Sequence, residues 1–244
     1  MSSLAENLER LEDLISAACL AAGRPRGEVE LMAVSKTFPA ESVAEAAALG
    51  LTLFGENRVQ EFANKALHAA DLWKASPAGP LRFNLIGHLQ SNKAARAAEL
   101  FDGIDSLDSL RLAERLDEAA GRYGKRLPVL IELKLSPEAT KTGVTPDSAD
   151  AAQLLERLPD FLNLETRGLM TIAPWGAPEE ETRACFRSLR TCRDRWATAH
   201  PNLHLDVLSM GMSGDFQLAI AEGSTRIRIG TALFGKRTPP VEVD

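Results

Sequence analysis

Short apolar segments alternate with amphipathic segments along most of this chain, and that rhythm limits the possible folds more than any other feature. Eight of the apolar segments have the length of a β-strand. The expected strands cover residues 31–35, 51–55, 83–87, 103–106, 129–134, 165–171, 205–209 and 226–229. Eight strands joined by helices predict an α/β fold, a single TIM-type (β/α)8 barrel, rather than an open doubly wound sheet.

Helices are expected between the strands, and several carry the residues that usually begin or end a helix. The expected helices cover residues 39–49, 57–70, 92–100, 108–123, 146–158, 178–198 and 214–222, with a short one at 232–235. Pro39 and Pro178 suit a first helical turn, and Gly50 and Gly223 suit C-terminal caps. Ser213 is expected to cap the helix after the seventh strand.

The first residues, 1–22, predict an amphipathic helix that covers the barrel. Leu4, Leu8, Leu11 and Ile15 recur at helical spacing, with charged residues between them. Such a segment differs from a signal peptide, which has an unbroken apolar stretch. We therefore expect a covering helix.

Length and charge exclude several classes of protein. The chain has 244 residues, a net charge of -6 and no basic block. This length suits one domain over 1–244, and the charge disfavours a nucleic-acid or anionic membrane partner. No apolar segment approaches the roughly 20 residues of a membrane-spanning helix.

Cysteine and histidine spacing gives no support to a disulfide framework or a metal site. The residues concerned are Cys19, Cys185, Cys192, His68, His88, His200 and His204. The cysteines form no CxxC pair and are odd in number, which suits a reducing compartment and predicts a cytoplasmic location. The histidines show neither HxxxH nor HExxH spacing.

Lys36 is the strongest candidate for a reactive residue. It follows the first strand in the run AVSKTFP, just before a proline that starts a helix. A partly desolvated lysine loses its proton more easily, as Schiff-base chemistry with a cofactor aldehyde requires. The alternative is an ordinary solvated lysine at a strand end.

Polar loops follow other strands, and in a barrel these loops meet at one face. GENRVQE follows the second strand, and SMGMSGD and Gly230-Thr231 follow the seventh and eighth. Glycine N–H groups, hydroxyls and the start of a helix predict a phosphate site, although these glycines could also be simple turns. Neither GxxxxGK[ST] nor GxGxxG occurs, which disfavours a nucleotide ligand.

Six stretches together resemble one family, the pyridoxal phosphate homeostasis proteins, which are related to the barrel domain of alanine racemase. They are AVSKTFP, FGENRVQE, IGHLQSNK, RGLMTIA, LSMGMSGDFQLAI and STRIRIGTALFG, and they span about residues 31–235 in the order of the family. The resemblance implies a barrel that binds pyridoxal 5'-phosphate (PLP) inside the cell, and that holds and supplies or buffers this cofactor.

The resemblance also implies roles for individual residues. Lys36 matches the Schiff-base lysine, Asn57 lies near the cofactor ring, and Arg228 faces the pyridine nitrogen. Ser209, Gly230 and Thr231 match the phosphate-binding positions. Asn84 stands where the family usually has histidine, which leaves the role of that histidine in doubt.

Two neighbouring assignments have simpler alternatives. Arg228 could belong to a strand-end ion pair, because Arg226 lies two residues earlier on the same strand face. Lys134 and Lys141 could form a second cationic docking point for phosphate, but a solvated loop is the simpler interpretation.

Two functions are compatible with a lysine-bound PLP. One is a carrier that passes PLP to PLP-dependent apoenzymes, and the other is a racemase-like enzyme. Arginine at the pyridine nitrogen favours holding the cofactor, because a guanidinium keeps its proton and is a poor proton donor. A racemase needs a second proton-transfer group opposite the lysine, and in the two-domain alanine racemase this group is a tyrosine. The only tyrosine here, Tyr123, is expected on the opposite barrel face, and few residues follow the eighth strand to form a second domain. We therefore expect a monomeric carrier without strong catalysis.

Overall fold

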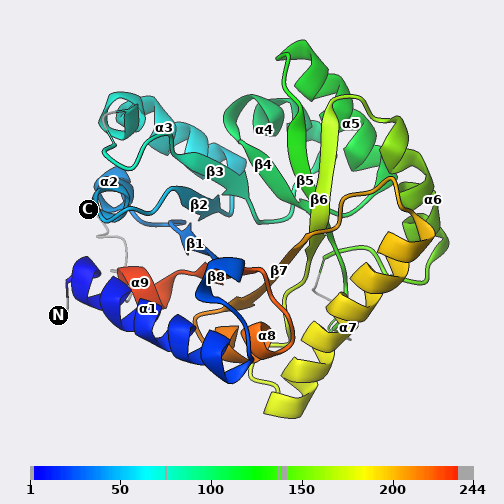
Figure 1. The fold of residues 1–244 in the computed structure, drawn as a ribbon. Coiled ribbons are helices and arrows are strands. Elements are labelled where there is room, and N and C mark those ends of the chain that lie inside the picture. The colour runs from blue at the N-terminus through cyan, green and yellow to red at the C-terminus, as the bar shows by residue number, and fades with distance from the viewer. Residues whose placement is uncertain (1–2, 75, 137, 139–141, 236–244) are drawn as a thin grey trace.

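All eight expected strands are present, and they form one closed parallel barrel in the order β1 to β8. The structure is a computed structural model that describes residues 3–74, 76–136, 138 and 142–235. The strands are β1 Glu30–Val34, β2 Leu53–Glu56, β3 Arg82–Leu85, β4 Gly103–Leu107, β5 Leu127–Glu132, β6 Leu164–Met170, β7 Val207–Met212 and β8 Arg226–Ile229. Helices surround the barrel, so the predicted (β/α)8 architecture is confirmed (Figure 1).

The expected helices are also present, each within a few residues of its predicted limits. The α-helices are α1 Leu4–Ala21, α2 Ala40–Ala48, α3 Val59–Lys74, α4 Ala94–Leu100, α5 Leu110–Arg122, α6 Ala149–Arg157, α7 Glu179–Ala199, α8 Phe216–Ala221 and α9 Thr231–Phe234. Short 3-10 helices are η1 Arg26–Glu28, η2 Ser91–Lys93 and η3 Leu158–Asp160. Gly50 and Gly223 follow α2 and α8 with φ of 95° and 100°, so both expected C-terminal caps are confirmed.

The covering helix α1 lies against the last two helices of the barrel. Ser3 and Glu6 form a capping box at its start, and its apolar face buries Leu11 and Ile15. Asn7 donates a hydrogen bond from Nδ2 to the carbonyl oxygen of Leu233 in α9, at 3.0 Å. Figure 1 shows α1, α8 and α9 grouped on one side of the barrel. The N-terminal segment therefore supports α9, which begins directly after the predicted phosphate loop.

Strand β7 is longer than predicted, and the reason is a bulge at glycine. The apparent turn residue Gly211 lies inside the strand with φ of 96°, and the pairing of β7 with β8 shifts register between Ser209 and Met212. Glycine adopts this positive φ without strain. Any other residue would also place its Cβ only 2.6 Å from the Cβ of Ala219. Ser209 consequently lies within the strand rather than at its end.

The expected cap of the helix after β7 was wrong. Asp215, and not Ser213, occupies the N-cap position of α8. The Ser213 hydroxyl instead accepts a hydrogen bond from the backbone N–H of Ala232, at 3.3 Å. The loop after β7 is thereby joined to the first turn of α9, a long-range contact that local spacing could not predict.

The prolines were also placed one residue too far into their helices. Pro39 and Pro178 occupy the N-cap positions, with extended backbone, and α2 and α7 begin at the next residue. This placement still uses the fixed φ of proline to direct the chain into the helix.

A buried polar network fills part of the barrel near the amino ends of the strands. Asn84 donates from Nδ2 to Asp105 Oδ1 at 2.7 Å, and Arg226 reaches both Asp105 and Glu30, at 3.2 and 2.9 Å. Buried polar groups need partners of this kind, since an unpaired one costs about 1–3 kcal/mol. Asn84 and Arg226 therefore have a structural role, because each provides a hydrogen-bond partner inside the barrel.

Candidate functional site

Lys36 lies in a tight turn directly after β1. The backbone N–H of Phe38 donates to the carbonyl oxygen of Ser35 at 3.1 Å, which closes a four-residue turn. Thr37 has φ of 68°, while Lys36 keeps a negative φ, and this is the pattern of a type II turn. Glycine or asparagine usually occupies the third position, and a β-branched residue there costs about 1–3 kcal/mol. The surrounding structure must hold Lys36 in this strained turn.

Three charged side chains from β2 and α3 hold the turn. Lys65 donates from Nζ to the carbonyl oxygen of Ser35 at 2.9 Å and to Glu56 Oε1 at 2.6 Å. The Ser35 hydroxyl donates to the same Glu56 oxygen at 2.8 Å, and the N–H of Thr37 donates to Glu61 Oε1 at 2.5 Å. Sequence reasoning missed this network, although Glu61 and Lys65 have the i,i+4 spacing that places both on one helix face.

Glu56 has no exposed surface, and burial raises its pKa. The ammonium of Lys65 and the hydroxyl of Ser35 oppose this rise, because both stabilise the carboxylate. Glu56 Oε2 has no hydrogen-bond partner among the described residues. The Lys65–Glu56 pair is therefore a buried ion pair placed directly behind the backbone of Lys36.

Lys36 and Asn57 line one cavity of about 190 Å³, as their predicted shared role requires. Thr37, Arg58 and Glu61 complete its lining. A Cβ at Gly87 would lie 2.2 Å from the carbonyl oxygen of Asn57, so only glycine allows the loops after β2 and β3 to approach this closely. The structure thus brings the first two predicted site residues together.

Arg228 is buried and oriented by Ser209 within β7 and by Thr171 just after β6. It donates from Nη1 to the carbonyl oxygen and the hydroxyl of Ser209, at 2.6 and 2.8 Å, and from Nη2 to the carbonyl oxygen of Thr171 at 2.8 Å. Burial lowers its pKa, while nearby Asp105, Asp215 and Glu132 act in the opposite direction. The structure separates it from Arg226, whose partners are carboxylates deeper in the barrel.

Gly230 and Thr231 lie beside the turn that carries Lys36. An ideal Cβ at Gly230 would be 3.6 Å from the carbonyl oxygen of Val34, the last residue of β1. The ring of Phe38 lies 4.9 Å from the ring of Phe234, which joins the lysine turn to α9. The loops after β1, β7 and β8 therefore meet at one corner of the barrel face.

Ser209 has a different environment from the other two predicted phosphate-binding residues. It has no exposed surface, and its hydroxyl accepts the hydrogen bond from Arg228. Thr231 is exposed, and Ser213 is half-buried with its hydroxyl directed at the first turn of α9. Ser213 is therefore a further candidate for this corner, which sequence reasoning treated only as a helix cap.

Glu132, at the end of β5, is a second buried carboxyl that sequence reasoning missed. Its Oε1 accepts from the Thr142 hydroxyl at 2.9 Å, and its Oε2 has no partner among the described residues. Burial raises its pKa; the Thr142 hydroxyl and nearby Arg228 oppose the rise, whereas Asp108 adds to it. A cavity of about 150 Å³ adjoins it, lined also by Lys134. Lys141, the other lysine considered for phosphate, lies outside the described residues.

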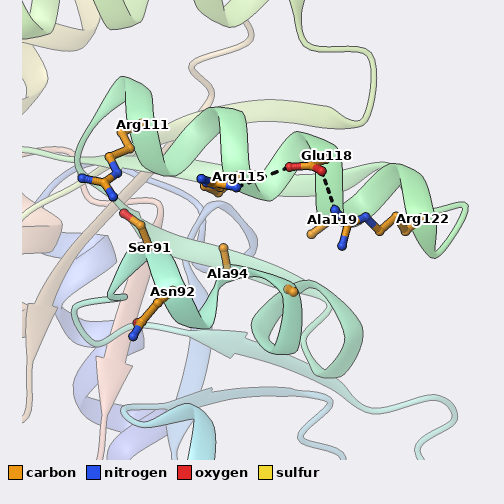
Figure 2. Close-up of a pocket in the computed structure, with 9 residues that line it drawn as sticks. Ser91, Asn92, Ala94, Arg111, Arg115, Glu118, Ala119 and Arg122 are labelled. Carbon is orange, nitrogen blue, oxygen red and sulfur yellow. Dashed lines mark hydrogen bonds and ion pairs between the residues drawn. The ribbon is translucent and has the colours of Figure 1, made fainter.

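A polar groove of about 330 Å³ on the outside of the barrel, between α4 and α5, contains none of the predicted site residues. Figure 2 shows Glu118 between Arg115 and Arg122, and it forms ion pairs with both. In the same view Arg111 points toward Ser91. The groove lining carries three arginines and one glutamate, but it contains no predicted site residue, so we place the candidate site at the strand ends.

Two further findings concern the described residues alone. They contain no group of three or more histidine, cysteine, aspartate or glutamate side chains that could hold a metal ion. None of their helices is long and apolar enough to cross a membrane. The tyrosine expected on the opposite face, Tyr123, indeed caps the end of α5, before β5 begins.

One known family matches this chain along almost its whole length and defines its class. The family described as alanine racemase, N-terminal domain, matches residues 2–238, so this chain carries that type of domain. Alanine racemase from Clostridium difficile 630 is a distant structural neighbour, with a TM-score of 0.72 and 16% identity, and this chain covers 58% of its length. At that identity the likeness concerns the fold.

More similar proteins identify the family within this class. The pyridoxal phosphate homeostasis protein of Pseudomonas aeruginosa is 43% identical over 238 residues, which is 97% of each chain. That of Escherichia coli K12 is 41% identical over 240 residues, or 97% of this chain and 98% of the relative. PipY from Synechococcus elongatus, solved with PLP bound, has a TM-score of 0.81 and 44% identity over 96% of this chain and 100% of its own. The chain belongs to the pyridoxal phosphate homeostasis protein family.

Burial of Glu132 predicts a pH dependence of stability. With its pKa raised in the folded state, the protonated carboxyl contributes stability that is complete below the unfolded pKa of about 4.5 and is lost as pH rises through the folded pKa. Glu132→Gln removes this loss and keeps an acceptor for Thr142. We expect its free energy of unfolding, relative to that of the wild type, to rise between pH 4.5 and pH 8.

Urea denaturation across this range measures the effect. Glu181→Gln, which removes one carboxylate from an exposed position of α7, is the control. A relative stability of Glu132→Gln that stays constant or falls with pH would contradict the assignment. Glu56 contributes a slope of the same sign, but it is present in both proteins and cancels in the comparison.

Proposed function

We propose that this protein binds PLP through Lys36 and acts in intracellular PLP homeostasis, holding the cofactor and supplying or buffering it. The observation that carries the proposal is the meeting of the Lys36 turn with the loops after β7 and β8 at one corner of the barrel. An amine and a phosphate-binding corner are the two features that this cofactor needs. The family relatives, named for PLP homeostasis, support the same conclusion.

The residues at this corner fit the cofactor chemically. Lys36 would provide the amine for a covalent Schiff base, and Asn57 would contact the ring beside it. Gly230 and Thr231 would provide N–H and hydroxyl donors to phosphate, with Ser209 as the third predicted contact. When bound, PLP supplies an electron-withdrawing ring, and the protein decides how strongly that ring acts.

Arg228 supports a carrier rather than an enzyme. Its donors already bind Ser209 and Thr171, and a guanidinium does not readily give up a proton even when burial lowers its pKa. A carboxylate at this position would keep the pyridine nitrogen protonated and strengthen the cofactor as an electron sink. We therefore propose binding without strong catalysis, with a racemase-like activity as the alternative.

We infer further that the chain acts as a single domain and as a monomer in the cytoplasm, and that its protein partners are PLP-dependent apoenzymes. The negative net charge and the absence of a basic block support a role without nucleic acid or a membrane.

Lys36 is expected to carry the cofactor. Protein saturated with PLP should show visible absorbance, and borohydride reduction should fix one phosphopyridoxyl group, because reduction makes the lysine–cofactor bond permanent. Mass spectrometry of peptides locates the group, with Lys36→Ala as the control. The assignment fails if Lys36 is unmodified in the saturated, reduced sample.

The phosphate corner is expected to distinguish PLP from pyridoxal. Ser213→Ala combined with Thr231→Ala should weaken PLP binding about tenfold or more and pyridoxal binding little, because each hydrogen bond to a charged group contributes about 1.5–3 kcal/mol. Ser209→Ala provides a comparison. If Ser209 contacts phosphate, its loss is also selective, whereas action through Arg228 weakens both ligands equally. Equal losses in the double variant would contradict the assignment of the corner.

The loaded protein is expected not to racemise or decarboxylate free amino acids efficiently. A positioned general acid or base accelerates a reaction about 10²- to 10⁴-fold. Tyr123 lies on the opposite face of the barrel and is too far from Lys36 to take this role. A panel of amino acids should be assayed for chiral inversion and carbon dioxide release, with Lys36→Ala as the control. A kcat of about 1 to 10³ per second that is lost in this control would favour the enzyme.

A further inference from the structure

Lys65 is the one lysine of the described residues that joins a buried carboxylate to the backbone of the Lys36 turn. Its side chain is 8% exposed, and its partner Glu56 is fully buried. One of its hydrogen bonds ends on the carbonyl oxygen of Ser35, which belongs to the peptide bond that enters Lys36. Lys65 therefore contacts the backbone of the turn from the side of α3.

The Ser35 carbonyl oxygen is the structural centre of the turn. It accepts from Phe38 N–H at 3.1 Å, which closes the turn, and from Lys65 Nζ at 2.9 Å. One helical turn earlier on α3, Glu61 accepts from Thr37 N–H. A single helix face thus binds the turn on both sides of Lys36.

This binding opposes the strain at Thr37. Without it, a β-branched residue with φ of 68° would relax toward the negative φ that such residues prefer. That change would turn the peptide between Lys36 and Thr37 away from Glu61 and loosen the backbone that carries the Lys36 side chain. The hydrogen bonds to Glu61 and Lys65 oppose it, because a charged partner makes a hydrogen bond stronger than a neutral one.

We propose that Lys65, paired with Glu56, is a positioning residue that aims the Lys36 amine at the cofactor-binding corner. This inference rests on the proposed function. Lys65 acts through the Ser35 carbonyl and not on the phosphate, so its loss slows covalent capture of PLP and of pyridoxal by the same factor. A misplacement of about 1 Å can cost about 100-fold in rate.

The test uses a double variant, Glu56→Gln with Lys65→Met. Removing Lys65 alone would leave a buried carboxylate without its ion-pair partner, and such a change often unfolds a protein. The double variant removes both charges, keeps an amide that can accept from Ser35, and deletes the donor to the Ser35 carbonyl. It therefore isolates the contact with the turn.

Lys125→Met is the matched control. Lys125 also donates from Nζ to backbone carbonyl oxygens, those of Ala98 and Glu99, at 3.0 and 2.7 Å. It lies just before β5, at the opposite end of the barrel from the lysine turn. Its loss removes a comparable structural contact without touching Lys36.

The full-length proteins are compared by the rate of covalent capture after mixing with PLP or pyridoxal, by mass spectrometry of the reduced products, and by thermal unfolding of the cofactor-free forms. The double variant is expected to capture both ligands about tenfold to 100-fold more slowly, still on Lys36, while the control captures them at the wild-type rate. Capture within twofold of wild type overturns the positioning role, as does a loss confined to PLP. If the wild type does not load Lys36, the proposed function itself fails.

Discussion

The pairing of β1 with β8 is the contact on which the candidate site depends. Four residue pairs join these strands, from Glu30 with Arg226 to Ala33 with Ile229, and they close the barrel. Closure places residues nearly 200 positions apart in the chain side by side, so that the Lys36 turn meets Gly230 and Thr231. An open sheet with the same strands would leave the amine and the phosphate loop at opposite edges.

The interior of the barrel contains buried charged residues, and they form two groups. Near the amino ends, Arg226, Asp105 and Asn84 satisfy one another. Near the carboxyl ends, Arg228 donates to neutral groups, and Glu132 keeps an oxygen without a partner among the described residues. Buried charges that are paired, as at the amino ends, stabilise one arrangement of the strands. Buried charges without a full set of partners, as at the carboxyl ends, are typical of a site that binds a ligand.

The Lys36 turn combines strain with rigid support. Thr37 occupies a backbone region that favours glycine, and α3 holds it there through Lys65 and Glu61. Strain held by rigid elements is a common way to orient a reactive group, because the orienting energy is supplied during folding rather than on binding.

The sequence alone determined the element order and the class of fold, and it supplied the candidate site residues. Strand and helix periodicity depends on neighbours in the chain, and the quoted motifs, through their resemblance to the family, propose Lys36, Asn57 and Arg228 as site residues without any coordinates. Only the tertiary structure decided which residues meet. It showed that Arg228 donates a hydrogen bond to the Ser209 hydroxyl, and that Ser213 contacts α9 instead of capping α8. It also showed that Lys65 pairs with Glu56 beside the Lys36 turn. Such contacts depend on barrel closure, on the bulge at Gly211 and on burial, and these bring together residues whose separation along the chain carries no signal of their proximity.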